Sequence, residues 1–181
     1  MIILETEHLL FRHLVPDDLD DLFALYRDPE IRRYFPDGTR TLAETREELE
    51  WFRHGHPEHP ELGLWATILK GEPGARGDDP GRFIGRCGLL PWTIDGVLEV
   101  EIAYMIAKPY WRRGLGSEAA RALVRHGFQQ LRLPRLIALV DPEHEASIRT
   151  AESAGLRRGR ETVMDGLPTV IYQIDNPPAG R

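Results

Sequence analysis

The chain lacks the features that mark secreted and membrane proteins. Cys87 is its one cysteine among 181 residues, which leaves no partner for a disulfide within the chain and fits a cytoplasmic location. No apolar run approaches the ~20 residues needed to span a bilayer. The first residues, MIILETEHLL, show neither the basic start nor the small-residue cleavage site of a signal peptide. We therefore expect a cytoplasmic protein without a membrane partner.

An excess of positive charge is also missing. The chain has 23 Lys and Arg against 29 Asp and Glu, a net charge of −6, which argues against nucleic acid as its partner. Its contents of 41% hydrophobic and 29% charged residues are ordinary for a globular protein. The length suffices for one domain with a sizeable core. We expect that domain over residues 1–175 and a disordered tail over residues 176–181.

Motifs for several familiar ligands are absent. The chain has neither the GxxxxGK[ST] sequence of P-loop NTPases nor a G-x-G-x-x-G sequence after a strand. His54, His56 and His59 lie close together between prolines, but their spacing completes no tetrahedral set of zinc ligands. We interpret them as part of a solvated loop and expect no metal. Cys87 has no local base, so we interpret it as a small strand residue.

Alternation and turn residues predict an α+β fold. It combines a mixed, mostly antiparallel sheet of six or seven strands with about four helices. The strands are expected over residues 9–14, 64–69, 82–92, 98–106, 135–140, 161–164 and 169–174. The helices are expected over residues 16–28, 41–52 and 145–154, with a longer helix that begins within residues 112–117 and runs to 131. A polar Gly/Pro loop over residues 71–81 is expected to be mobile.

The most informative stretch runs from Glu101 to Phe128 and reads as a strand, a glycine-containing turn and a helix. Residues 98–106 alternate, with the even-numbered residues on an apolar face and Glu99 and Glu101 on the other. Pro109 ends the strand because it has no N–H to donate. After the turn, apolar residues recur at helical spacing, as expected of a helix that packs on a sheet.

The turn itself suits an anion. The first N–H groups of a helix have no intrahelical partner, and the helix dipole adds partial positive charge there. Gly114 and Gly116 leave the backbone accessible, while Arg112 and Arg113 add cationic charge. The turn therefore predicts a phosphate site, above all for a diphosphate. A glycine-rich turn with solvated arginines is the alternative.

This stretch resembles the acyl-CoA motif of the GNAT N-acetyltransferases, usually written Q/R-x-x-G-x-G/A. The run EIAYMIAKPYWRRGLGSEA is similar to the branch that includes the RimJ/RimL-type protein N-terminal acetyltransferases. Trp111 stands at the Q/R position, as is common in that branch. Ala103, Arg112 and Ser117 stand where the branch usually has Gly, Gly and Thr.

A second stretch, PEHEASIRTAESAGL over residues 142–156, resembles the family pattern P-x-N-x-x-S-x-x-x-x-x-x-x-G-F. Ser147 and Gly155 match, whereas His144 replaces the usual Asn and Leu156 the usual Phe. The two motifs occur in the expected order and separation. The resemblance covers roughly the whole chain.

The resemblance implies a GNAT-like fold in which the strand ending at Ile106 and the strand over residues 135–140 splay apart. It also implies acetyl-CoA as the acyl donor, with its pantothenate arm in that gap. The implied contacts are the backbone of Tyr104, Met105 and Ile106 for the arm, the run Arg112, Arg113, Gly114, Leu115, Gly116 and Ser117 for the diphosphate, and His144 and Ser147.

The chemistry of acyl transfer to an amine assigns candidate roles. The amine must lose a proton, the carbonyl oxygen gains charge, and the thiolate leaves more easily with a proton donor. Glu101 is the candidate base, since neighbouring carboxylates and partial burial would raise its pKa; a solvated strand face is the alternative. Ser147 is the candidate donor to the thiolate, or else a helix-start residue bonded to its own backbone. His144 is either a CoA contact or a second base.

We therefore predict an acetyl-CoA-dependent N-acetyltransferase that acts on a primary amine by direct attack in a ternary complex. The acceptor is either a protein N-terminus or a small molecule. A non-catalytic acyl-CoA-binding or sensor domain is the alternative, because the chain departs from the motifs at several positions. The sequence leaves a homodimer open.

Overall fold

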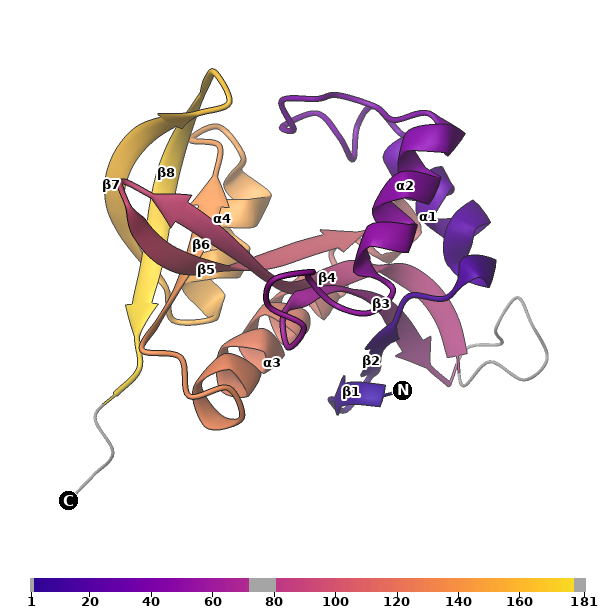
Figure 1. Cartoon of the computed structure of the whole chain (residues 1–181), viewed down its shortest axis with the longest axis horizontal. Helices are drawn as coiled ribbons and strands as arrows, with labels where there is room; N and C mark the ends of the chain where they lie inside the picture. Colours follow the sequence, from indigo (N-terminus) through magenta and orange to yellow (C-terminus); the bar gives the residue numbers. More distant parts are fainter. Residues whose placement is uncertain (1, 72–80, 178–181) are drawn as a thin grey trace.

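A computed structural model of the chain describes residues 2–71 and 81–177 (Figure 1). Within them, eight strands form one sheet in the order β1-β2-β3-β4-β5-β6-β8-β7. The strands are β1 (Ile2–Glu5), β2 (Leu9–His13), β3 (Gly63–Lys70), β4 (Gly81–Ile94), β5 (Val97–Ile106), β6 (Arg135–Val140), β7 (Arg157–Met164) and β8 (Leu167–Asp175). The α-helices are α1 (Leu19–Tyr26), α2 (Leu42–Phe52), α3 (Leu115–Gln129) and α4 (Glu145–Ser153).

The α+β class and the four helices are confirmed, but the sheet is larger than the six or seven strands predicted. The additional strand, β1, is a short edge strand whose pairing with β2 is irregular between Ile2 and Leu4. Such a strand buries little of either face, so it has no alternation to detect. In the same way β7 begins at Arg157 rather than Glu161, because its first residues are exposed.

Two expectations concern the ends of described segments. The polar loop over residues 71–81 falls mainly outside the described residues, and so does the tail beyond residue 177. Asn176, the first residue of the expected tail, donates a hydrogen bond from Nδ2 to the carbonyl of Leu133 at 2.9 Å. The division into one domain over residues 1–175 and a tail stays a prediction. In the described part of the chain, every helix is too short or too polar to cross a membrane.

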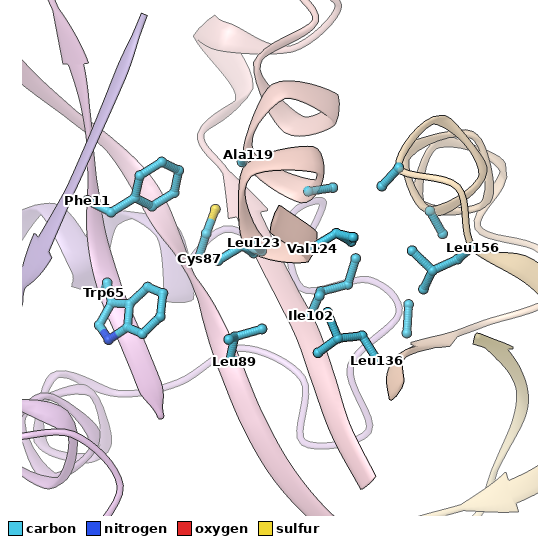
Figure 2. Close-up of a cluster of buried hydrophobic side chains, with 14 of the residues drawn as sticks. Phe11, Trp65, Cys87, Leu89, Ile102, Ala119, Leu123, Val124, Leu136 and Leu156 are labelled. Atoms are coloured by element: carbon cyan, nitrogen blue, oxygen red, sulfur yellow. The ribbon is translucent and has the colours of Figure 1, made fainter. Parts of the chain in front are cut away.

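The helices cover both faces of the sheet (Figure 1). On one face α3 packs against β4, β5 and β6, and α1 and α2 pack on the other face. Figure 2 shows Leu123 and Val124 of α3 pointing toward the strands that carry Cys87, Leu89 and Ile102. Cys87 is fully buried in this cluster, which confirms its interpretation as a strand residue.

The alternation of β5 is confirmed where helices cover it. Val100 and Ile102 face the α3 cluster, while Ala103 and Met105 face α1 and α2. The prediction is wrong for Leu98, which is 55% exposed. The alternating pattern extends further toward the β4–β5 turn than the helix that covers the strand, so its first apolar residue meets solvent.

The sequence Thr41-Leu-Ala-Glu44 predicts a capping box at the start of α2, and the structure confirms it. The Thr41 hydroxyl accepts a hydrogen bond from the Glu44 amide at 3.3 Å, and the Glu44 carboxylate accepts one from the Thr41 amide at 2.7 Å. Helical spacing predicts an inward face made of Leu42, Thr45, Leu49 and Phe52. Of these, Thr45, Leu49 and Phe52 are buried. Leu42 is 39% exposed, which contradicts its predicted inward position. It is the first residue of the helix and lies beyond the edge of the core.

The feature that matters most for a binding site is the pair β5–β6. A strand, a helix and a strand in that order predict a parallel pair. The two strands are indeed parallel, but they pair only at Glu101 and Ile137. By contrast, β4 and β5 pair along their whole length, from Gly85–Ile106 to Ile94–Val97. The strands therefore separate beyond Glu101, and the predicted splay is present.

The two leucines Leu123 and Leu42 allow the packing of the core to be tested. Leu123 is fully buried, so Leu123→Ala should lower the free energy of unfolding by about 2–5 kcal/mol through lost contacts and a cavity. The matched variant Leu42→Ala should change it by less than about 0.5 kcal/mol. Urea unfolding followed by circular dichroism measures both. Equal losses in the two variants would show that Leu42 packs inward after all.

Candidate active site

The gap between β5 and β6 opens into a cleft of about 1270 Å³. Nearly all of the residues predicted for the site line it, although they come from β5, the turn before α3, and α4. These are Glu101, Tyr104, Met105, Ile106, Arg112, Gly114, Leu115, Gly116, Ser117, His144 and Ser147. Arg113 does not contribute to the lining; its guanidinium lies 5.3 Å from the centre of the Tyr110 ring.

The turn before α3 exposes the start of the helix to the cleft. Gly114 is the N-cap residue with a φ of +78°, and Arg112 also has a positive φ of +61°. No side chain among the described residues caps this end of α3. Gly116 lies in the first helical turn, where an added Cβ would meet only the Thr150 hydroxyl, at 3.8 Å. The left-handed conformations of the turn thus fall on Arg112 and Gly114, whereas Gly116 keeps the approach to the amides open.

Glu101 lies at the point where β5 and β6 separate. One carboxylate oxygen accepts a hydrogen bond from the indole N–H of Trp92 at 2.7 Å, and the backbone of Leu139 also donates to the carboxylate. Burial raises the pKa of Glu101 to about 7, although these hydrogen bonds and the charge of Arg86 act in the opposite direction. Neighbouring carboxylates, which we expected to contribute, are not among the causes. Glu99 instead lies 3.7 Å from Arg135.

Tyr104 and Ser147 meet across the cleft. The Tyr104 hydroxyl donates a hydrogen bond to the Ser147 carbonyl at 3.0 Å and lies 3.0 Å from the Ser147 hydroxyl. Burial raises the pKa of Tyr104, so this hydroxyl keeps its proton at neutral pH. Only the backbone of Tyr104 was expected at the site from the family resemblance. The one signal for its side chain was a hydroxyl on an otherwise apolar strand face.

His144 is the N-cap residue of α4 and stacks on Tyr34, with ring centroids 4.1 Å apart and planes 18° apart. Burial lowers the pKa of His144, so its ring is neutral at pH 7. Tyr34 belongs to the loop between α1 and α2, which extends toward α4 in Figure 1. We expected the first two helices and the loop after Phe35 on the acceptor side of the site, but no motif in the loop predicted that Tyr34 stacks on His144.

The other candidate sites do not assemble. His56 and His59 lie near each other, with ring centroids 5.8 Å apart, but no cluster of metal-ligating side chains occurs in the described part of the chain. Burial raises the pKa of the Cys87 thiol, which disfavours a reactive thiolate.

The raised pKa of Glu101 has a measurable effect on stability. The folded state holds this proton up to about pH 7, whereas a free glutamate releases it near 4.5. The folded state therefore binds more protons in this window, and the free energy of unfolding should fall as the pH rises from about 4.5 to about 7. Glu101→Gln should remove this part of the pH dependence, as measured by urea unfolding across the window. An identical pH dependence in both proteins would contradict the raised pKa.

Comparisons with known proteins agree with this geometry. Residues 8–157 match the model of the acetyltransferase (GNAT) domain. The uncharacterized protein YkkB of Bacillus subtilis is 30% identical over 94% of this chain and 94% of its own length. A GNAT-family acetyltransferase from Bacillus anthracis has a similar structure, with a TM-score of 0.79, 26% identity, and coverage of 97% of this chain and 99% of its own.

A more distant likeness concerns the fold alone. RimL, a ribosomal L7/L12 alpha-N-protein acetyltransferase solved with coenzyme A, is 14% identical with a TM-score of 0.73, and the match covers 97% of this chain and 98% of that one. The family match spans most of the chain and includes β5, the start of α3 and α4, which line the cleft. The protein belongs to the GNAT family of acetyltransferases, enzymes that use acetyl-CoA as the acyl donor.

Proposed function

We propose that the protein transfers the acetyl group of acetyl-CoA to a primary amine by direct attack in a ternary complex, with Glu101 as the base. The observation that carries this proposal is a partly buried carboxyl with a pKa of about 7, held in the same cleft as the uncapped start of α3. A carboxyl of ordinary pKa would be a weaker base at neutral pH.

The residues present fit acetyl-CoA. Unpaired amides at the start of α3 suit its diphosphate, and Gly116 leaves them open. The edge of β5 beyond Glu101 has no paired partner in β6, so its backbone is free to bind the amide groups of the pantothenate arm. When bound, acetyl-CoA supplies the acetyl group as a thioester. Arg112, His144 and Ser147 complete the proposed binding set.

Glu101 would take the proton that the amine loses. Its hydrogen bonds from Trp92 and from the Leu139 backbone fix the orientation of the carboxyl toward the cleft. Near pH 7 both its charged and neutral forms are populated, so it can accept a proton and release it again. His144 is the alternative base, because its ring is also neutral at this pH.

The Tyr104–Ser147 pair would supply the proton for the leaving thiolate. The Tyr104 hydroxyl stays protonated and lies 3.0 Å from the Ser147 hydroxyl. Ser147 would give its proton to the thiolate and take one from Tyr104, and water in the open cleft would then return a proton to Tyr104. Ser147 keeps the role assigned from its motif, and the structure adds Tyr104 as a neighbour that can return a proton to it.

The acceptor is an amine of one of two kinds. The resemblance of the EIAY and YWRRGLGSEA segments to the RimJ/RimL branch, together with the fold of RimL, favours a protein N-terminus. The α1–α2 loop over the cleft favours a small molecule, since its contact between Tyr34 and His144 narrows the approach. The single buried thiol, Cys87, fits a protein of the reducing cytoplasm.

Acetyl-CoA should stabilise the protein through the open start of α3. A ligand present at ~100 times its Kd adds about 2.7 kcal/mol to the free energy of unfolding, so acetyl-CoA and CoA should raise the Tm while ATP and NAD should not. Gly116→Val should lose this shift, because its side chain obstructs the amides while meeting only Thr150. The control Arg121→Val places the same residue on the exposed face of α3 and should keep the shift. Normal acetyl-CoA binding by Gly116→Val would place the phosphates elsewhere.

Measurements of CoA release test both the need for an amine acceptor and the role of Glu101 as the base. CoA release from acetyl-CoA should depend on an added amine, and Glu101→Gln should lower kcat/KM by about 10²-fold or more near pH 7. The loss should shrink at higher pH, because more of the amine is then already deprotonated. Glu99→Gln is the matched control; Glu99 lies two residues earlier on the same strand and pairs with Arg135. Acetyl-CoA affinity should stay unchanged in both variants.

Ser147→Ala and Tyr104→Phe should also slow turnover, but their defect should persist at high pH because they act on the leaving thiolate. Full activity of Glu101→Gln at pH 7 would remove Glu101 from the mechanism and leave His144 as the base to test. CoA release that no amine stimulates would contradict acetyl transfer to an amine.

A further inference from the structure

The cleft contains a buried arginine that the proposed mechanism does not use. Arg86 of β4 is 6% exposed and lines the cleft. Its Nε donates a hydrogen bond to the Tyr26 hydroxyl at 2.9 Å. In residues 2–71 and 81–177, no carboxylate forms an ion pair with Arg86, and its two terminal nitrogens have no hydrogen-bond acceptor. A guanidinium is always charged, and a buried charge without a partner is costly.

The neighbouring charges are already paired. Arg32 binds Asp37 and the carbonyl of Gly38, and Arg40 binds Asp37 and Glu48. Tyr26 donates its proton to Glu48, and burial raises the pKa of Tyr26, so it stays neutral beside Arg86. The group thus holds three guanidinium groups and two carboxylates, with one positive charge left over. That charge belongs to Arg86, the member without a carboxylate partner.

The position of Arg86 relative to Glu101 is set by the sheet. Arg86 pairs with Met105 and Leu90 pairs with Glu101, so both side chains point to the same face, four residues apart along the strands. Four residues correspond to about 13 Å between the two rows of Cα atoms. Ala103 lies between them on β5 and lines the cleft with a small side chain. The charge of Arg86 is felt at Glu101, where it opposes the rise in pKa.

We propose that Arg86 binds a carboxylate of the acceptor, so that the substrate is a small amine that also carries a carboxylate, such as an amino acid. The planar fork of arginine matches a carboxylate with two parallel hydrogen bonds. The depth of Arg86 suits a small anion rather than a protein chain, and Phe35, whose ring centre lies 5.9 Å from the guanidinium carbon, forms an apolar wall beside it. This inference rests on the proposed acetyl transfer to an amine.

The test compares each amino acid with its own carboxamide, which has a similar shape but lacks the negative charge. The panel holds leucine, phenylalanine, β-alanine, 4-aminobutyrate and 6-aminohexanoate with their amides, and a peptide amidated at its C-terminus. CoA release should show at least one amino acid preferred over its amide by about 10- to 100-fold in kcat/KM, the range of a charge-assisted hydrogen bond. Because the ω-amino acids differ in length, the best of them reports the spacing between Glu101 and Arg86.

Variants assign the preference to Arg86. Arg86→Met should reduce the ratio of amino acid to amide to about 1, mainly by raising KM for the amino acid. Tyr26→Phe breaks the same hydrogen bond but keeps the charge, so it should keep the ratio. Both proteins are first checked for the Tm shift with acetyl-CoA. If Arg86→Met fails this check, Arg86→Gln replaces it, since its amide can still donate to Tyr26.

A second readout separates this inference from the proposed function. Isothermal titration calorimetry of the CoA-saturated protein should detect the preferred amino acid but not its amide, and Arg86→Met should abolish the signal. Binding without turnover would support the carboxylate site and overturn the amine acetylation. Turnover of amides or of the amidated peptide at rates equal to or above those of the amino acids would overturn the carboxylate site alone. An unchanged ratio in Arg86→Met, or no binding of any amino acid, would also overturn it.

Discussion

The separation of β5 and β6 after a single paired position is the constraint on which the site depends. The strands meet at Glu101 and Ile137 and then diverge, while β4–β5 and β6–β8 continue as ordinary ladders. Divergence leaves backbone groups of two central strands without sheet partners, which a folded protein rarely tolerates unless something else binds them. The same divergence creates the cleft and places the Glu101 carboxyl at its branch point, where it is removed from bulk water without losing contact with the cleft.

The partly buried Glu101 and the buried Arg86 lie on the same face of the sheet but differ in whether they can lose their charge. Glu101 is surrounded by neutral donors and can exist without charge, so burial moves its pKa toward neutrality and suits it to proton transfer. Arg86 cannot discharge, and its nearest hydrogen-bond partner is a phenol that stays neutral. A group that titrates fits a chemical step, whereas a group with a permanent charge fits recognition of a permanent opposite charge.

The loop between α1 and α2 contacts both Arg86 and the start of α4. Its residues Arg32 and Phe35 lie beside Arg86, and Tyr34 stacks on His144 at the start of α4. His144 stands where the family pattern usually has Asn. The stacking gives this replacement a physical role, because a flat ring can pack against Tyr34. The loop therefore connects the start of α4 with the part of the cleft that holds Arg86.

The sequence by itself determined the elements whose signals are local. The alternation of residues 100–106, the glycine turn, the capping box at Thr41 and the two motifs located seven of the eight described strands, the helices and part of the cleft lining. The spacing of apolar residues did not predict burial where no other element covers the side chain. Leu98 and Leu42 have the spacing of core residues, but both are exposed. The cause of the Glu101 pKa, the meeting of Tyr104 with Ser147 and the unpaired charge of Arg86 were decided only by the tertiary structure. Each of these depends on desolvation or on contacts between distant segments, and neither is encoded in the spacing of residues along the chain.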